Sequence, residues 1–503
     1  MNLRSKLFLD YYVGGFLHAV LRIPTIFLGK LLRRDHDLST CREIAILKLL
    51  GGGSLVIAYP ALLALRRLPG LERLTLITTP AIAPFGALLG IFDEIVIVRD
   101  DHGLLTLAAD SVRAFRKFFR HDALVDLEIH SRLTTVFALL TAARNRIGFF
   151  TNISFWRRHL NTHLLFCNIT NGICDFYDQL ATLFGTSPVD AGGCEREFQS
   201  RLGEYGFEGD VFRLANAPAR YSLSRERMPR REEWAEVAAR RIARWEPAMV
   251  ELHPLAAPVD RAEIEPVSIR RGGQFQGRAV VRNYAGKTSL QELAAIPGAS
   301  PVDAEECERE FRSRLGEYGF EGGQFRLAVA PACSGLSRER MLRREEWVEI
   351  VAQRIARCEP ATAELHLLGG PADRAELEQM KTLLEERFQC RVVVRNHAGR
   401  TSLQESVRII AAMDEVLCID SALLHFSRLL GRRTVSFWGP TDPRTLLRPN
   451  SRSLDEIHYV KIPCSPCVHM SHQPPCKGQN ICMRLAVDPA APVPRNQPWV
   501  LKG

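Results

Sequence analysis

Residues 416–443 read "VLCIDSALLHFSRLLGRRTVSFWGPTDP" and decide which fold the chain adopts. The apolar, β-rich run Val416–Ile419 is followed at once by Asp420 and Ser421, where a segment with helical spacing begins. A second β-rich run, Thr434–Trp438, ends in a turn written GPTDP. A strand, a helix and a second strand in this order predict one unit of a parallel sheet.

The end of the first of these strands carries the residues that suggest a ligand. Open α/β sheets bind ligands at the carboxyl ends of their strands, which is where Asp420 and Ser421 stand. The free N–H groups of the following helix would point toward a phosphate, and His425 lies on its first turn. Taken alone, Asp420 would be read as a cap of that helix. The grouping favours a pocket for a nucleotide diphosphate.

The chain before this unit shows the same alternation. From Arg42 to about Gly185, short β-rich runs such as "REIAILKLL" and "DEIVIV" alternate with helical segments. The first run leads into the glycine-rich turn Gly51–Ser54, whose glycines allow the backbone to approach a substrate or diphosphate closely. Because Lys48 precedes the glycines instead of following them, a nucleotide-hydrolysing P-loop is excluded. This region predicts a second α/β domain with a parallel sheet.

The length of the chain limits the number of domains, and its net charge limits the kinds of partner. A chain of 503 residues predicts two to four domains, and a net charge of +9 gives no reason to expect a nucleic-acid partner. Residues 1–34 hold six basic residues against one acid, Asp10. Within them, Leu7–Arg34 is apolar, but polar residues and a proline leave no clean run of about 20 apolar residues for a spanning helix.

Segment Leu7–Arg34 also lacks the small-residue cleavage site of a removable signal peptide. We expect it to lie in the membrane interface, its basic side chains toward anionic headgroups, on a cytoplasmic protein attached to the periphery of the inner membrane. The alternative is a helical hairpin packed on the protein's own surface.

A long internal repeat interrupts the chain. Pro188–Arg220 recurs as Pro301–Cys333, with 26 of 33 positions identical, and the offset of 113 residues persists without a gap. The second copy continues into a regular helix and strand, whereas the first has Pro266 and Gly272–Gly273 at the matching positions, which would break the helix. We therefore expect the second copy to be the working domain and the first to be an inserted, partly decayed duplicate.

Five segments are thus expected along the chain. They are an interfacial segment at 1–40, an acceptor domain at 41–187, the inserted duplicate at 188–300, a donor-binding domain at 301–460 and a cysteine-rich tail at 461–503.

Several of these motifs resemble glycosyltransferase family 9, the heptosyltransferases. The resemblance rests on Asp420–His425 followed by the GPTDP turn, on the glycine turn with the helix after it, and on "RIGF" at the end of Asp126–Phe149. It covers about residues 42–187 and 301–487 in order. It implies a GT-B architecture, in which two Rossmann-like domains face a cleft, and metal-independent, inverting sugar transfer from a nucleotide sugar such as ADP-heptose to a lipid-linked saccharide.

The resemblance also implies roles for individual residues. The donor site would contain Gly52, Gly53, Ser334, Arg340, Asp373, Asp420, Ser421, His425, Gly439 and Thr441. At the glycine turn the family carries an aspartate that is the presumed base, and this chain has Ser54 in its place.

A serine cannot act as a base unaided, so three readings stay open. Glu128, which follows the predicted strand Ala123–Leu127, could serve as the base, with His130 on the same side. The acceptor could need little base catalysis. Alternatively, the protein could be an inactive binder of sugar nucleotides or glycolipids.

The carboxyl-terminal tail holds four cysteines, Cys464, Cys467, Cys476 and Cys482. A Cys-x-x-Cys followed by two further thiols is compatible with a structural zinc site, although the spacing of the second pair departs from the usual pattern. The alternative is a compact loop with buried free thiols. No other cofactor is expected.

Overall fold

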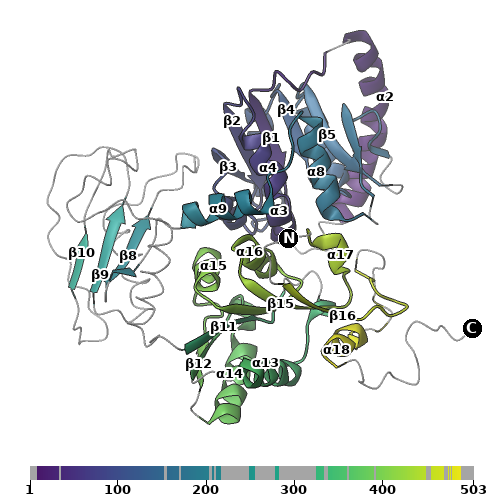
Figure 1. The fold of residues 1–503 in the computed structure, drawn as a ribbon. Coiled ribbons are helices and arrows are strands. Elements are labelled where there is room, and N and C mark those ends of the chain that lie inside the picture. The colour runs from purple at the N-terminus through teal and green to yellow at the C-terminus, as the bar shows by residue number, and fades with distance from the viewer. Residues whose placement is uncertain are drawn as a thin grey trace, which may run out of the picture. The chain divides into compact units, whose positions relative to one another are not determined.

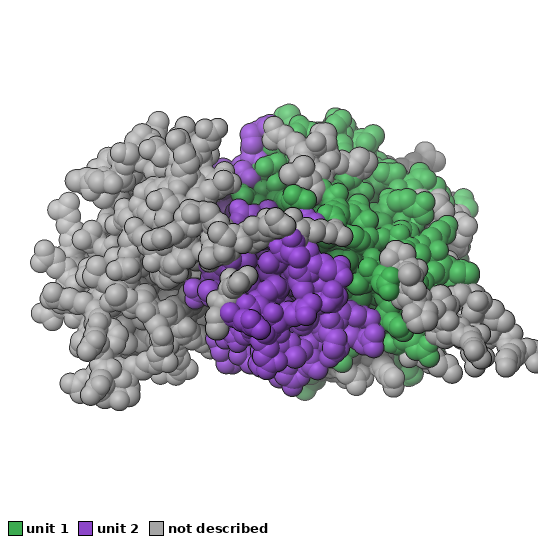
Figure 2. All heavy atoms as spheres, turned by 60° about the horizontal axis from the view of Figure 1, so that its bottom comes forward, with its two compact units in different colours: residues 1–195, 333–342, 418–503 green, residues 196–332, 343–417 purple. Residues whose placement is uncertain are grey.

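The computed structural model describes most of the chain in two compact units. The described residues are 8–32, 35–151, 156–168, 171–202, 324–333, 338–358, 362–389, 392–448, 455–468, 474, 476 and 478–488, together with the strand backbone at 207–208, 211–216, 249–254 and 278–281. Unit 1 consists of residues 1–195, 333–342 and 418–503, and unit 2 of residues 196–332 and 343–417 (Figure 2).

The first six-stranded sheet is parallel and has the strand order β3-β2-β1-β4-β5-β6 (Figure 1). This is the 3-2-1-4-5-6 order of doubly wound, dinucleotide-binding folds. Its strands are β1 (Glu43–Leu47), β2 (Arg73–Thr78), β3 (Glu94–Ile97), β4 (Ala123–Asp126), β5 (Asn145–Phe150) and β6 (His163–Phe166). The helices between and after them are α3 (Gly52–Ile57), α4 (Tyr59–Arg66), α5 (Ala83–Leu89), α6 (Leu104–Lys117), α7 (Arg132–Leu140) and α8 (Ile173–Leu183).

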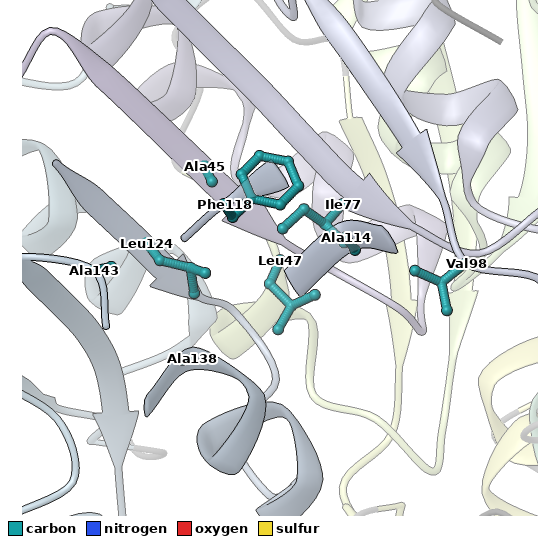
Figure 3. Close-up of a cluster of buried hydrophobic side chains, with 9 residues drawn as sticks. All are labelled: Ala45, Leu47, Ile77, Val98, Ala114, Phe118, Leu124, Ala138 and Ala143. Atoms are coloured by element: carbon teal, nitrogen blue, oxygen red, sulfur yellow. The ribbon is translucent and has the colours of Figure 1, made fainter. Parts of the chain in front are cut away.

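A buried apolar cluster joins this sheet to its helices (Figure 3). The cluster consists of Ala45, Leu47, Ile77, Val98, Ala114, Phe118, Leu124, Ala138 and Ala143. Strands β1, β2 and β4 read as nearly continuous apolar runs because helices cover both faces of a parallel sheet. The cluster therefore holds the strand ends that present the glycine turn and Glu128.

The second six-stranded sheet repeats the order of the first, as β13-β12-β11-β14-β15-β16. Its strands are β11 (Gln324–Ala330), β12 (Thr362–Leu367), β13 (Val392–Asn396), β14 (Glu415–Ile419), β15 (Arg433–Trp438) and β16 (Asp455–Tyr459). The associated helices are η3 (Arg338–Arg340), α13 (Arg344–Cys358), η4 (Pro371–Asp373), α14 (Arg374–Phe388), α15 (Leu403–Ala411), α16 (Ala422–Leu429), α17 (Pro443–Leu446) and α18 (Ile481–Val487). The predicted α/β class with two Rossmann-like sheets is confirmed.

The first copy of the repeat builds a smaller sheet with the order β10-β9-β8-β7. Strands β8 (Val211–Asn216), β9 (Met249–Pro254) and β10 (Arg278–Val281) are parallel, and β7 (Phe207–Glu208) is antiparallel. At the offset of 113 residues, β8, β9 and β10 coincide with β11, β12 and β13. The first copy therefore repeats the first half of the second sheet. Pro266 and Gly272–Gly273 lie outside the described residues.

The start of the first copy is built into unit 1. Helix α9 (Ala191–Leu202) begins there, and the N–H of Val189 donates to the carbonyl of Pro60 at 3.1 Å. Cys194 is buried, and the Glu195 carboxylate lies so close to Gly431 that a Cβ there would meet Oε1 at 2.4 Å. The first residues of the duplicate therefore pack within unit 1, because they contact the helix α4 region and the turn after α16.

We predict that deleting residues 188–300 leaves a soluble, cooperatively folding protein. The deletion joins Ser187 to Pro301, and residues 301–315 repeat the buried apolar side chains of 188–202: Cys194, Phe198 and Leu202 recur as Cys307, Phe311 and Leu315, while the buried Gly192 becomes Glu305. The second copy can therefore supply the contacts that α9 makes. Gel filtration and thermal unfolding measure the outcome. Deleting residues 188–315 removes both copies of the helix and should abolish folding; equal behaviour of the two deletions would contradict the prediction.

Candidate functional site

Asp420 and Arg340 form a buried ion pair at the end of β14. The Nη1 of Arg340 donates to the Oδ2 of Asp420 at 3.0 Å and to its main-chain carbonyl at 2.8 Å. The side chains are 16% and 7% exposed, so the pair is largely removed from water. A guanidinium is thereby fixed beside the first turn of α16 by direct contact of these two residues, whose place in a donor site stays a prediction.

Two hydroxyl groups near this pair are buried without a partner. The Oγ of Ser421, the N-cap residue of α16, makes no capping hydrogen bond, and the Oγ1 of buried Thr441 is likewise without a hydrogen-bond partner among the described residues. Buried hydroxyls that lack partners are uncommon, because each one costs the free energy of a lost hydrogen bond. The first turn of α16 and the GPTDP loop therefore each present a polar atom that a ligand could satisfy.

His425 lies in the same helix and faces the same carboxylate. Its Nε2 is 3.8 Å from the Oδ1 of Asp420. Burial lowers the pKa of His425 to about 4, although the Asp420 carboxylate opposes the shift. The imidazole is therefore neutral at physiological pH and able to donate one hydrogen bond and accept another.

The glycine turn closes against α5 and α16. Gly51 has a left-handed backbone with φ of +75°, which a side chain would strain. A Cβ on Gly52 would lie 2.5 Å from the ring of Phe85, and one on Gly53 would lie 3.4 Å from the Cδ2 of His425. These close approaches are made to side chains of the protein itself, and the expected approach to a substrate or diphosphate stays a prediction.

Glu128 holds the strand that precedes the glycine turn. Its Oε1 accepts hydrogen bonds from the N–H groups of Leu49 and Leu50 at 2.8 and 2.9 Å and from the Nζ of Lys48 at 3.2 Å. Burial would lower the pKa of Lys48, but Glu128 and Tyr177 outweigh it and raise the pKa. Three donors on one oxygen make Glu128 a positioning residue for the turn, and these hydrogen bonds leave its second oxygen, Oε2, uninvolved.

Ser54 is engaged within the turn. Its hydroxyl donates to the carbonyl of Gly51 at 2.7 Å and is hydrogen-bonded to the side chain of Tyr177. Burial raises the pKa of Tyr177, which keeps the phenol protonated. Lys48 and Tyr177 were not among the predicted site residues. A lysine within an otherwise apolar strand was the available signal for Lys48, because such a charge requires a buried partner.

Four other predicted residues lie elsewhere or make local contacts. His130 is exposed at the bend after Glu128. Gly439 packs against α18, since a Cβ there would lie 2.7 Å from the Sγ of Cys482. In unit 2, the Oδ2 of Asp373 accepts the N–H of Gly370 at 2.8 Å. Ser334 lies outside the described residues.

The four tail cysteines are all described, and the cysteines that the structure describes are free thiols. Burial raises the pKa of Cys467 to about 11 and that of Cys482 to about 12, and the neighbouring cysteines add to both shifts. Within the described part of the chain, no group of three or more histidine, cysteine, aspartate or glutamate side chains could hold a metal ion. The geometry therefore lends the zinc prediction no support.

Unit 2 contains a stacked histidine pair at the ends of β12 and β13. The rings of His366 and His397 are parallel within 2°, and the Nδ1 of His366 lies 3.0 Å from the Nε2 of His397. One nitrogen must donate and the other accept, so the accepting ring must be neutral and both rings cannot be protonated. Burial lowers the pKa of His397 to about 4, and it lowers that of His366 well below its ordinary value.

This pair predicts an acid-dependent loss of stability. Because the folded-state pKa of His397 is about 4 and the unfolded value is about 6.5, its contribution is complete above pH 6.5 and is lost as the pH falls toward 4. This pKa shift of His397 corresponds to about 3 kcal/mol of folding free energy. Chemical unfolding should be measured between pH 7.5 and 4, in steps of about half a pH unit. The free energy of unfolding should fall less steeply with decreasing pH in His397→Asn than in the wild type. His130→Asn, at an exposed position, is the control, and identical slopes for all three proteins would refute the assignment.

Comparisons with known proteins find a family match in the carboxyl-terminal part of the chain. The model of glycosyltransferase family 9 (heptosyltransferase) matches residues 327–477. The lipooligosaccharide heptosyltransferase 2 of Haemophilus influenzae is 33% identical over 78 residues, which are 16% of this chain and 22% of that protein. The matched segment thus spans about a fifth of that relative's length.

Two solved structures match this chain with low TM-scores and low sequence identity. The E. coli ADP-heptose lps heptosyltransferase II gives a TM-score of 0.46 at 13% identity, covering 83% of this chain and 91% of that one. The E. coli heptosyltransferase WaaC with ADP-2-deoxy-2-fluoro heptose gives 0.45 at 13% identity, covering 82% and 92%. The family match includes Arg340, Asp420, His425 and Thr441. Residues 327–477 of this chain are therefore similar to glycosyltransferase family 9 (heptosyltransferase).

Proposed function

We propose that the protein is an inverting glycosyltransferase that moves a heptose-like sugar from a nucleotide sugar such as ADP-heptose to a lipopolysaccharide core or related glycolipid. The observation that carries the proposal is the buried Arg340–Asp420 pair at the first turn of α16, with the unpartnered hydroxyls of Ser421 and Thr441. The match to the family model and the similarity to a lipooligosaccharide heptosyltransferase support a heptose-like sugar and a glycolipid acceptor.

The donor diphosphate would bind at the first turn of α16. The free N–H groups there and the Arg340 guanidinium supply positive potential, and the hydroxyls of Ser421 and Thr441 supply hydrogen bonds to phosphate oxygens. As the acceptor hydroxyl attacks the anomeric carbon, the bond from that carbon to the diphosphate oxygen breaks and the nucleoside diphosphate leaves. These same groups would stabilise the charge that develops on the leaving diphosphate. No step in this scheme requires a metal ion.

The acceptor hydroxyl must also lose its proton. Glu128 has one oxygen occupied by three donors, so only Oε2 could take part, and Ser54 is engaged with Gly51 and Tyr177. This arrangement favours a second candidate function, an inactive protein that binds a sugar nucleotide or glycolipid without turnover. The two functions differ in whether the acceptor triggers release of the nucleoside diphosphate.

The decisive experiment measures nucleoside diphosphate release by the purified full chain from ADP-heptose and a panel of other nucleotide sugars, with and without a lipid-core acceptor extract. Acceptor-dependent release supports the transferase. Binding of a nucleotide sugar without release supports the inactive binder. Ser54→Asp, with Ser54→Asn as the matched control, then tests the base: faster release only in the aspartate variant shows that the wild type is limited by its missing carboxylate.

A further inference from the structure

The amino-terminal helical segment exposes a continuous apolar stripe. It consists of η1 (Asp10–Gly14) and α2 (Gly15–Leu32), which Figure 1 shows as one helix at the side of the first sheet. On α2, Leu28 is 49% exposed, and the side chains of Phe16, Val20, Ile23, Phe27 and Leu31 are 69, 53, 75, 68 and 66% exposed. Their spacing of three and four residues places them on one face of the helix. Large apolar side chains aligned along one helix face form a continuous exposed patch, which differs from the single apolar residues that are normal on protein surfaces.

The other side of the segment is fastened to the protein. The Asp10 carboxylate accepts hydrogen bonds from the Oγ of Ser131 at 2.6 Å and from the N–H groups of Arg132 and Leu133 at 3.0 and 2.9 Å. Asp10 thereby caps the N-terminus of α7, which favours a negative charge. Gly14 is buried, and a Cβ there would lie 2.9 Å from the Cβ of Arg132.

Two further contacts continue this attachment along the helix. The guanidinium of Arg132 donates to the carbonyl of Tyr11 at 3.0 Å and lies over the Tyr11 ring, 4.7 Å from its centroid. The Nε2 of His18 lies 2.7 Å from the carbonyl of Trp156, and burial lowers the pKa of His18. The polar groups of the segment are therefore directed to the protein, which leaves the apolar stripe outward.

The charge around the stripe indicates which partner covers it. Residues 1–34 contain six basic residues, and their one acid, Asp10, is bound to α7. Arg22 is exposed beside the stripe. A segment with an exposed apolar face and an excess of basic residues fits a leaflet of anionic phospholipid, which attracts about 1 kcal/mol per basic residue near its surface.

Asp10–Leu28 is also long and apolar enough to cross a membrane by composition. Crossing would pull Asp10 from α7 and His18 from Trp156 and would place Arg22 in hydrocarbon. Lying in the plane keeps each of these contacts. We propose that η1 and α2 form an in-plane anchor by which the folded protein binds the surface of an anionic phospholipid membrane.

Vesicle flotation tests the anchor with the full chain. We expect the wild type to float with vesicles that contain phosphatidylglycerol and much less with pure phosphatidylcholine, and we expect added salt to weaken binding. The triple variant Phe16→Ser, Ile23→Ser, Phe27→Ser should bind about a hundredfold more weakly. Leu105→Ser is the matched control, because Leu105 is 89% exposed on α6 and should leave binding unchanged. An unaltered thermal midpoint shows that the triple variant is folded.

Three results would overturn the proposal. The first is equal binding by the wild type and the triple variant, or no binding by either. The second is resistance of the bound wild type to alkaline carbonate extraction, which would show a spanning helix. The third is a dimer of the wild type in gel filtration that the triple variant abolishes, without any vesicle binding, which would show that a second copy covers the stripe.

Discussion

Arg340→Ala should lower the rate of sugar transfer about 100- to 1,000-fold. Removal of one group that stabilises developing negative charge costs about 2.7–4 kcal/mol in other enzymes. Arg340 is the cation held beside the first turn of α16 by Asp420, so its loss removes the positive charge proposed to face the leaving diphosphate. The measurement is the turnover number and Michaelis constant for the nucleotide-sugar donor at saturating acceptor.

Arg343→Ala is the matched control for this prediction. Arg343 lies three residues further along, is 66% exposed and pairs with Glu346 on the surface, so its removal should change transfer less than twofold. A thermal midpoint for Arg340→Ala close to that of the wild type separates lost chemistry from lost folding. Partial recovery of Arg340→Ala by added guanidinium would show a direct role for the charge, and transfer within threefold of the wild type would remove Arg340 from the site.

Arg157→Met should lower the free energy of unfolding by about 3–5 kcal/mol, the cost of leaving one member of a buried ion pair alone. Arg157 and Asp126 have no exposed side-chain surface, and the Nη2 of Arg157 lies 3.3 Å from the Oδ2 of Asp126. Nη2 also donates to the carbonyls of Ser131, at 3.0 Å, and of Glu128. Arg157 therefore supports the loop that carries Glu128 and the start of α7.

Urea unfolding measures the effect, with Arg158→Met as the control because the side chain of Arg158 is exposed. The second variant, Arg157→Met combined with Asp126→Asn, should recover part of the loss, since the asparagine leaves no buried charge unpaired. Burial raises the pKa of Asp126 to about 6 although Arg157 lowers it, so desolvation of the carboxylate outweighs the attraction of the pair. A loss below about 1 kcal/mol in Arg157→Met would contradict this account.

The strands of both sheets could be located from the sequence. Val416–Ile419 and Thr434–Trp438 were expected as strands, and the structure has Glu415–Ile419 and Arg433–Trp438. Apolar runs bounded by turns carry this information locally, because a strand buried on both faces must be apolar throughout. The neighbourhood of Asp420 and His425 could be predicted for the same reason, since both follow one strand within a single turn of helix.

The contacts of Glu128 could not be predicted in this way. The residue was expected at the end of a strand, and the structure places it there, but its partners are Lys48, Leu49 and Leu50, about eighty residues earlier. Parallel strands bring together residues that lie far apart in the chain, so the partner of a strand-end carboxylate depends on strand order. For the same reason, Gly439 was expected at the donor and packs against Cys482.

The sequence by itself determined the α/β class, the two sheets, the repeat and the grouping of Asp420, Ser421 and His425. These follow from periodicity and from residues close together in the chain. Tertiary structure alone decided that Arg157 is buried against Asp126, that Asp10 caps α7 and that the first residues of the first copy belong to unit 1. Whether a charge is buried and paired depends on which distant segments pack against it, and local sequence carries no record of that packing.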